Sequence, residues 1–267
     1  MWIESHTCRG RGEVNHISPG RVTEMNAARR ERYHAPVEIQ ETSLRDLVSK
    51  LPRPALGEAQ LNLLDGGQDN AAARAHLFMA GDTSLLKERC IAVIGARKAS
   101  ELGRKRARKF ARELAEAGVV VVSGLADGID TEALTSALDA GGRVVAVIGT
   151  PLDQAYPAKN KALQEIIYRD HLLVSQFPRG TRVFPSNFPA RNRTMAALSD
   201  ASVVMEASDT SGTLHQAAEC MRLGRWLGIA RGVADDPTLT WPTSFVDKPG
   251  CVVLATTEQF LETVYAR

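Results

Sequence analysis

The chain has 267 residues, of which 44% are hydrophobic, enough to fill one well-buried core and a smaller appendage. No apolar run approaches the roughly 18 residues of a membrane-spanning helix, and the N-terminus lacks an apolar signal region, so we expect a soluble cytoplasmic protein with no membrane association. The four cysteines are far apart without zinc-ligand spacing, which indicates neither a disulfide framework nor a structural metal site.

The net charge of +2 hides an uneven distribution of charge along the chain. Residues 90–194 carry 16 basic and 10 acidic side chains, whereas residues 195–267 carry 5 and 9. Because a local positive field attracts polyanions whatever the total charge, the middle section predicts an anionic partner.

The first 75 residues are predicted to form an N-terminal extension that is partly flexible or contains short helices. Residues 1–39 show no sustained apolar period, which favours partial flexibility. Residues 43–64 favour one or two short helices, interrupted at Pro52 and Pro54, and a linker follows. We expect a second unit over residues 76–267.

From residue 91 onward, the chain contains seven short, β-branched apolar runs. They cover residues 91–94, 119–122, 144–148, 172–174, 202–205, 226–229 and 251–254. Because the runs lack apolar/polar alternation and leave room for helices between them, they predict parallel strands buried on both faces. Apolar positions from Ala107 to Ala115 predict one such helix, which ends at Gly118. The predicted fold class is α/β, a doubly wound, mostly parallel Rossmann-like sheet with a small N-terminal region.

Three of the predicted strands are followed by loops rich in glycine and hydroxyl groups, at residues 95–100, 123–128 and 209–213. In open parallel sheets, such loops lead into helix N-termini, whose amide groups and positive dipole ends attract phosphate. One loop alone is typical of an ordinary turn, but three on one edge, with Arg97 in the first, predict phosphate binding. No Walker sequence or complete G-x-G-x-x-G motif follows the first strand, which disfavours a P-loop nucleotidase or an ordinary dinucleotide enzyme.

The segment 176–194, QFPRGTRVFPSNFPARNRT, contains four arginines and three phenylalanines but no acidic residue. Proteins that bind single strands combine a cationic track for the backbone with aromatic faces on which bases stack. The candidates are Arg179, Arg182, Arg191 and Arg193 for the track and Phe177, Phe184 and Phe188 for stacking. The phenylalanines could instead be core residues that cover the sheet edge. We expect the loop around Arg191 and Arg193 to be exposed, so that exchanging both for Glu removes binding without unfolding the protein.

Other charged groups have simpler interpretations. The basic residues from Arg104 to Arg112 lie opposite the apolar stripe of their helix and predict a solvated face or an accessory DNA track. Asp130 is expected at a helix N-terminus rather than in a metal site, and His215 is expected to be structural or exposed. No nucleophile and base stand at supporting positions, so we expect no catalytic residue, metal or cofactor.

Five motifs together resemble the DprA/Smf family of DNA-processing proteins. They are IGARKAS (94–100), VVSGLADGID (121–130), VVAVIGTPLDQAYP (144–157), FPARNRTMAALS (188–199) and SGTLHQAAECMRLGR (211–225). The resemblance spans roughly residues 76–232. It implies a Rossmann-like core that binds single-stranded DNA, forms a homodimer and helps to load the recombinase RecA during natural transformation.

The resemblance also implies which positions contact phosphate. Carried over residue by residue, these are Gly95, Arg97, Ser100, Ser123, Gly124, Arg191, Asn192, Arg193, Ser211, Gly212 and Thr213. Arg179, Arg182 and Phe188, from the arginine-rich segment, complete the predicted nucleic-acid-binding site.

The sequence departs from the family pattern at several positions. Asp127 and Leu134 stand where Arg and His are usual, and His215 stands where Ile or Val is common. These changes leave a second hypothesis open, in which the pocket binds or hydrolyses a free nucleotide or a nucleotide-derived signal. In a third hypothesis, the protein is a structural partner of another nucleic-acid protein and docks through residues 61–64 or 258–265.

Overall fold

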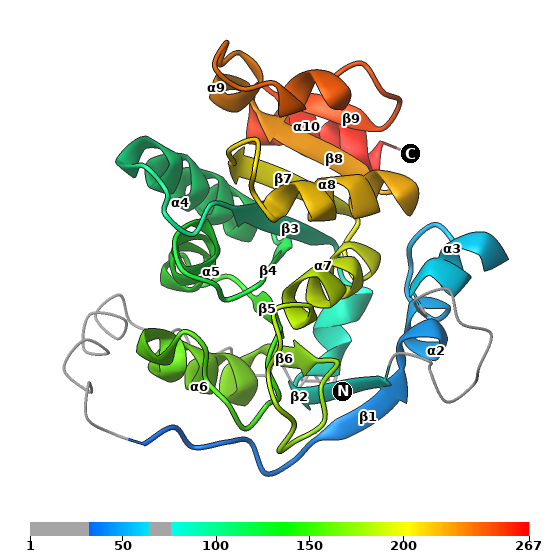
Figure 1. Cartoon of the computed structure of the whole chain (residues 1–267), viewed down its shortest axis with the longest axis vertical. Coiled ribbons are helices and arrows are strands. Elements are labelled where there is room, and N and C mark those ends of the chain that lie inside the picture. Colours follow the sequence, from blue (N-terminus) through cyan, green and yellow to red (C-terminus); the bar gives the residue numbers. More distant parts are fainter. Residues whose placement is uncertain (1–31, 65–75, 267) are drawn as a thin grey trace, which may run out of the picture.

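Nine strands form one sheet within residues 32–64 and 76–266, the part of the chain that the computed structural model describes (Figure 1). The strands are β1 (Gln40–Ser43), β2 (His76–Gly81), β3 (Cys90–Gly95), β4 (Val120–Ser123), β5 (Val144–Ile148), β6 (Leu172–Ser175), β7 (Ala201–Glu206), β8 (Trp226–Ala230) and β9 (Cys251–Leu254). Their order is β1-β2-β6-β5-β4-β3-β7-β8-β9, and the strands from β6 to β9 in this order are parallel. The seven predicted strands are therefore confirmed.

The sequence did not predict β1 and β2, which are antiparallel. β1 pairs with β2, and β2 pairs with β6 at the edge of the parallel strands. The sequence of β1 is QETS, which has no apolar run and therefore gives no strand signal. Residues 40–43 of the predicted N-terminal extension thus lie in the same sheet as the rest.

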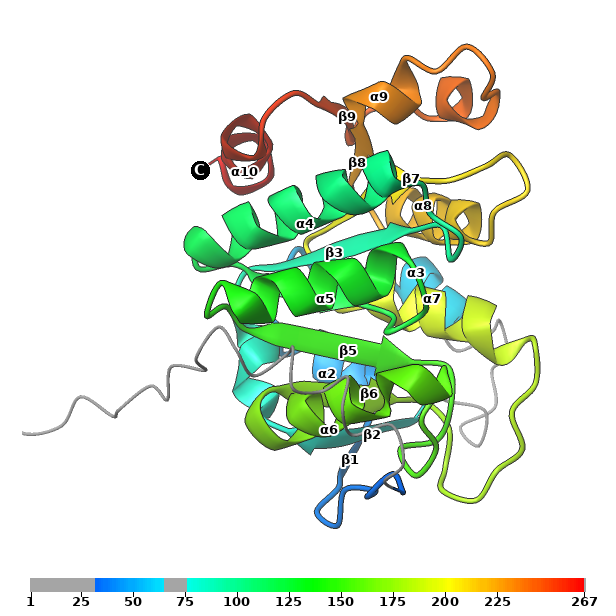
Figure 2. The ribbon, with the colours of Figure 1, turned by 90° about the vertical axis from the view of Figure 1, so that its left-hand side faces the viewer.

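Helices cover both faces of the sheet, as Figures 1 and 2 show. One face carries α4 (Glu101–Glu116), α5 (Ile129–Asp139) and α6 (Lys161–Asp170), with α10 (Thr257–Tyr265) beside α4; the other carries α7 (Asn187–Ala197) and α8 (Thr213–Arg222). The shorter helices are α2 (Leu44–Val48), α3 (Glu58–Leu64), α9 (Arg231–Ala234) and the 3₁₀ turns Thr83–Lys87, Ala158–Asn160 and Trp241–Ser244. Within the described ranges, no helix is both long and apolar enough to cross a membrane. The doubly wound α/β class is confirmed, and α2 and α3 lie within residues 43–64, where the sequence predicted short helices. The predictions for residues 1–31 and 65–75 lie outside the described residues.

Helix α4 is the helix that the apolar period predicted. Ser100 caps it, because its hydroxyl oxygen accepts a hydrogen bond from the backbone N–H of Gly103 at 3.0 Å. Phe110 and Leu114 are buried, and Phe110 contacts Phe260 of α10 with ring centroids 6.1 Å apart. Gly118, with φ +70°, follows the helix end in the left-handed conformation that glycine adopts without strain.

The strand order reverses between β3 and β7. From β3 the chain winds through β4, β5 and β6 on one side, and it then returns to place β7, β8 and β9 on the other. Such a switch point leaves a crevice at the carboxyl ends of the two central strands. The loops that follow β3 and β7 therefore face each other.

A buried polar cluster joins the N-terminal region to the opposite, amino ends of the strands. Arg53 Nε lies 3.1 Å from Asp200 Oδ1, and Arg53 Nη1 donates to the carbonyl oxygen of Leu86 at 2.6 Å. Asp200 Oδ2 accepts from the backbone N–H of Cys90 at 2.7 Å and from the Tyr265 hydroxyl at 2.9 Å. Burial raises the pKa of the Cys90 thiol to about 12, so this residue is a protonated core cysteine.

The buried His171 makes the stability of the fold depend on pH. Neither ring nitrogen has a hydrogen-bond partner within the described part of the chain, and burial lowers the pKa of the imidazole. The unfolded chain binds the proton more readily, so the free energy of unfolding should fall as the pH drops below about 6.5. Urea titrations between about pH 8 and pH 5 measure this effect, and a His171→Leu variant should show a shallower decrease. Equal slopes in the two proteins would contradict the prediction.

Candidate nucleic-acid interface

A cleft of about 710 Å³ opens at the switch point between β3 and β7. Its walls are the loop after β3, the first turns of α4, α7 and α8, and the loop after β7, together with Ala126 and Asp130 near the start of α5 and residues 232–239 in and after α9. The predicted site residues that line it are Gly95, Arg97, Ser100, Phe188, Arg191, Asn192, Ser211, Gly212 and Thr213. The fold thus brings together three segments that are far apart in the sequence.

The loop after β3 presents a guanidinium group to the cleft. Gly95 lets this loop approach α5, because a Cβ there would lie 2.6 Å from Ile129 Cγ1. Arg97 is exposed, and its Cζ lies 4.9 Å from the centroid of the Phe188 ring. No ion pair neutralises Arg97 among the residues that the structure describes. A planar cation stacked on an aromatic ring therefore forms one rim of the cleft.

Phe188 belongs to a small aromatic cluster beside the cleft. It packs against Gly149, where a Cβ would lie 2.7 Å from Phe188 Cδ1, and its ring centroid is 5.7 Å from that of Tyr156. Tyr156 is 49% exposed, so it offers a ring face to a ligand. The sequence analysis did not select Tyr156, although its place before a proline in the third motif was a signal.

The arginine-rich motif is helical where the sequence predicted a loop. Residues 187–194 form the first turns of α7, with Pro189 at the third position. Proline is tolerated there because the first backbone N–H groups of a helix have no intrahelical acceptor. The helical geometry turns Arg191 inward, leaving it only 5% exposed. The prediction that Arg191 lies in an exposed loop is therefore wrong.

Arg191 ties α7 to the ends of two strands. Its Nη1 donates to the carbonyl oxygens of Gly124 at 2.5 Å and Val147 at 2.9 Å. Gly124 makes room for it, since a Cβ there would lie 1.6 Å from Nη1. Burial raises the pKa of the nearby Asp130 carboxyl, and the charge of Arg191 partly opposes this shift. Ser123 is also buried and donates to the carbonyl oxygen of Val93 at 2.7 Å. Ser123 and Gly124, which the sequence analysis placed in the site, therefore do not line the cleft.

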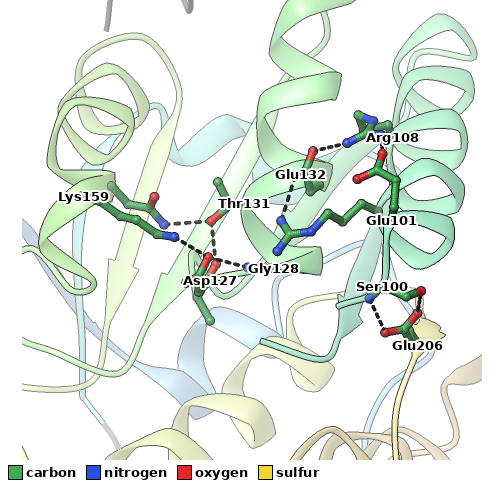
Figure 3. Close-up of polar contacts among 12 residues, drawn as sticks. Ser100, Glu101, Arg108, Asp127, Gly128, Thr131, Glu132, Lys159 and Glu206 are labelled. Atoms are coloured by element: carbon green, nitrogen blue, oxygen red, sulfur yellow. Dashed lines mark hydrogen bonds and ion pairs between the residues drawn. The ribbon is translucent and has the colours of Figure 1, made fainter. Parts of the chain in front are cut away.

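A carboxylate that the sequence analysis did not select lies at the N-terminus of α4. Glu206, the last residue of β7, accepts hydrogen bonds from the Ser100 backbone N–H at 2.8 Å and from the Ser100 hydroxyl at 2.5 Å (Figure 3). Its position at the carboxyl end of a strand was the available signal. Ser100 therefore already has an anionic partner within the chain.

The N-terminus of α8 forms the opposite side of the cleft. The Ser211 hydroxyl accepts from the Thr213 backbone N–H at 3.2 Å, and the carbonyl oxygen of the exposed Gly212 accepts from the Asn192 side chain at 3.4 Å. Asn192 Oδ1 also accepts from Arg191 Nε at 2.9 Å, which connects this turn to α7. His215 is exposed in the same first turn and lies outside the cleft lining.

Residues 68–264 match the family model named DNA recombination-mediator protein A. This chain belongs to the DprA/Smf family. It is 45% identical over 149 residues to DNA processing protein DprA of Streptococcus pneumoniae, which covers 56% of this chain and 52% of the relative. The X-ray structure of the S. pneumoniae protein superposes with a TM-score of 0.67 at 33% identity, covering 84% of this chain and 74% of that chain.

A second solved structure shares the DprA fold. This is the structure of DNA processing protein A from Helicobacter pylori, which was solved in a study of how that protein binds single-stranded DNA. It superposes on this chain with a TM-score of 0.65 at 23% identity. It covers 85% of this chain and 96% of that chain, and at this identity the likeness concerns the fold. The present DprA-family chain spans about half the length of the curated relatives it matches.

Three predicted arginines of this DprA-family chain do not line the cleft. Arg179 donates to the carbonyl oxygen of Pro36 at 2.5 Å, and Arg182 lies over the Phe184 ring at 5.6 Å. Arg193 is partly exposed on α7. The structure therefore places these side chains along the segment before α7 and on α7 itself, apart from the cleft walls.

Ion pairs neutralise several charges around the cleft of this DprA-family chain (Figure 3). Lys159 Nζ lies 2.6 Å from Asp127 Oδ1 and lowers the pKa of that carboxyl. Arg104 and Arg108 on α4 pair with Glu132 at 3.0 and 2.9 Å. The cationic side chains that line the cleft, are at least partly exposed and have no ion pair within the described ranges are Arg97, Lys98 and Arg106. Arg191 also lines the cleft, but it is buried and donates to backbone carbonyl oxygens.

Proposed function

We propose that this protein binds single-stranded DNA in the cleft and acts in DNA processing, uptake or recombination without catalysing a reaction. The observation that carries the proposal is the gathering of Arg97, Lys98 and Arg106, without ion-pair partners in the described residues, beside an aromatic cluster at a sheet switch point. Cations that follow the backbone and planar groups that stack on bases are the two components of such sites.

The arrangement suits a strand that is held by its backbone. The three cations are placed to contact phosphates, and the exposed Arg97 lies over the Phe188 ring, where its guanidinium can also meet a base. Tyr156 adds an exposed ring next to the half-buried Phe188. Stacking accepts every base, so this site is expected to bind without sequence preference.

The relatives support the proposal. The S. pneumoniae relative is named a DNA processing protein, and the H. pylori structure concerns binding of single-stranded DNA by that protein. By analogy with the family, we extend the proposal to RecA as a partner, to a homodimer and to a cytoplasmic location. Residues 76–267 would be the Rossmann-like binding unit, and residues 1–75 an extension that adds β1 to the sheet edge.

The hypothesis of a free nucleotide receives less support. Asp127 and His215 suggested this hypothesis, because they depart from the family pattern. However, Asp127 is paired with Lys159, and neither residue lines the cleft. The two residues that motivated this hypothesis therefore lie outside the cleft lining, although Gln216, another departure from the family pattern, lines it. Single-stranded DNA remains the better ligand for the cations that do line it.

The salt dependence of oligo-dT binding tests the proposal. Three phosphate contacts at about −0.7 each predict a slope near −2 in a plot of log association constant against log salt concentration. Fluorescence anisotropy with a series of oligo-dT lengths measures the affinity, the slope and the site size together. A slope near zero, or thermal stabilisation by mononucleotides with none by oligo-dT, would reject single-strand binding.

A further inference from the structure

The carboxylate of Glu206 occupies the place at the N-terminus of α4 where an anion would bind. Oε1 accepts from the Ser100 backbone N–H and Oε2 accepts from the Ser100 hydroxyl, as Figure 3 shows. Gly103, in the first turn, leaves room for this group, because a Cβ there would lie 2.1 Å from Glu206 Oε2. Any other residue at that position would push the carboxylate away. The first turn of α4 is therefore shaped around it.

The backbone of β7 delivers Glu206 to this position. The pairing of β3 with β7 shifts register between Ile94 and Gly95, so that Gly95 stands opposite Glu206. The carbonyl oxygen of Glu206 accepts from the Ala96 backbone N–H at 2.8 Å, which fixes the residue at the mouth of the crevice. The side chain lines the same cleft as Arg97 and Phe188.

The negative charge of Glu206 has no cationic partner in the described residues. Its stabilisation comes from Ser100 and from the positive end of the α4 dipole, the groups that bind phosphate at helix N-termini in other proteins. The N-terminal cap of α4 does not depend on Glu206, since the Ser100 hydroxyl already accepts a hydrogen bond from the Gly103 backbone N–H at 3.0 Å. Asp130 and Asp236 also line the cleft, but Glu206 is the carboxylate that accepts hydrogen bonds from Ser100 at the N-terminus of α4.

We infer that Glu206 determines which phosphates the cleft accepts, by blocking the α4 N-terminus to phosphomonoesters. A phosphomonoester carries about −1.5 to −2 charges at neutral pH, so it gains more from a free helix N-terminus, and is repelled more strongly by a carboxylate there, than an internal phosphodiester with one charge. The cleft therefore takes the interior of a strand and rejects 5′-phosphate ends, mononucleotides and inorganic phosphate. This inference rests on the proposed binding of single-stranded DNA.

A Glu206→Gln variant tests the inference, because glutamine keeps the shape and one acceptor oxygen but removes the charge. Binding of a short oligo-dT with and without a 5′-phosphate is measured by fluorescence anisotropy for both proteins. The variant should gain about tenfold in affinity for the phosphorylated oligonucleotide, with at most about a twofold change for the other. Equal changes for the two oligonucleotides overturn the inference.

Glu101→Gln is the matched control. Glu101 is an exposed acid in the first turn of α4, next to Ser100, and it pairs with Arg108 outside the cleft lining. Removing its charge should leave the preference between the two oligonucleotides unchanged. The same gain in both variants would indicate a general electrostatic effect and would also overturn the inference.

Inorganic phosphate and dTMP separate this inference from the proposed function. If the protein does not bind oligo-dT, the proposed function fails, but the Glu206→Gln variant should still gain thermal stabilisation by these two ligands over wild type. If the Glu206→Gln variant folds poorly, a Glu206→Asp variant takes its place, because its shorter side chain moves the charge away from α4. It should also gain thermal stabilisation by the two ligands. No added stabilisation in either variant rejects the role of Glu206.

Discussion

Replacing Arg191 with alanine should lower the free energy of unfolding by about 3 kcal/mol. Its guanidinium is buried and donates to the carbonyl oxygens of Gly124 and Val147. In the alanine variant, the two buried carbonyl oxygens lose this donor. The nearby Asp130 also loses the positive charge that favours its ionised form. Urea unfolding at neutral pH, followed by circular dichroism, measures the loss.

Arg193→Ala provides the matched comparison, since it removes the same side chain two residues along α7, where the residue is partly exposed. Its free energy of unfolding should stay within about 0.5 kcal/mol of the wild-type value. Adding Asp130→Asn to Arg191→Ala should restore part of the lost stability, because the uncompensated charge is then removed. Equal losses from Arg191→Ala and Arg193→Ala would show that the buried hydrogen bonds contribute little.

Replacing Arg97 with alanine should weaken binding of oligo-dT at least tenfold while the protein stays folded. A charge-assisted hydrogen bond to a phosphate is worth about 1.5 to 3 kcal/mol, and about 1.4 kcal/mol corresponds to a factor of ten. The salt slope should become shallower by about 0.7, since one fewer phosphate is neutralised. Fluorescence anisotropy at several salt concentrations gives both values, and thermal unfolding checks the fold.

Two further variants show whether the position of Arg97 matters. Arg112→Ala removes an exposed arginine of α4 that does not line the cleft, so the affinity should change less than about twofold. Arg97→Lys keeps the charge but loses the planar group over Phe188, and its affinity should lie between those of wild type and alanine. If the Arg112 and Arg97 alanine variants bind equally weakly, the cleft is not the site.

The parallel strands could be predicted from sequence because burial on both faces demands continuous apolar runs, as in β4 and β5, where every residue is buried. The edge strands could not. β1 is polar, and β2 includes Leu, Met and Ala, which have little intrinsic preference for strands. Their pairing with the rest of the sheet decides their conformation, and that information is not local.

The site was predictable in its loops and less so in its side chains. The glycine- and hydroxyl-rich loops after β3 and β7 line the cleft, where the sequence placed the site, whereas Ser123 and Gly124 of the predicted loop after β4 do not. Two prolines around residues 185–189 suggested a turn, so the inward direction of Arg191 was missed. Glu206 was missed because Ser100, its partner, lies 106 residues earlier in the chain. Contacts between distant segments leave no periodic trace in a sequence.

The polar cluster around Arg53 and Asp200 lies at the amino ends of the strands, whereas the cleft lies at their carboxyl ends. The six residues of β3 span about 20 Å at roughly 3.3 Å each, so the strand holds the two sites apart. None of the residues of this cluster lines the cleft. A substitution in the cluster is therefore expected to change the stability of the sheet without removing a residue from the cleft wall.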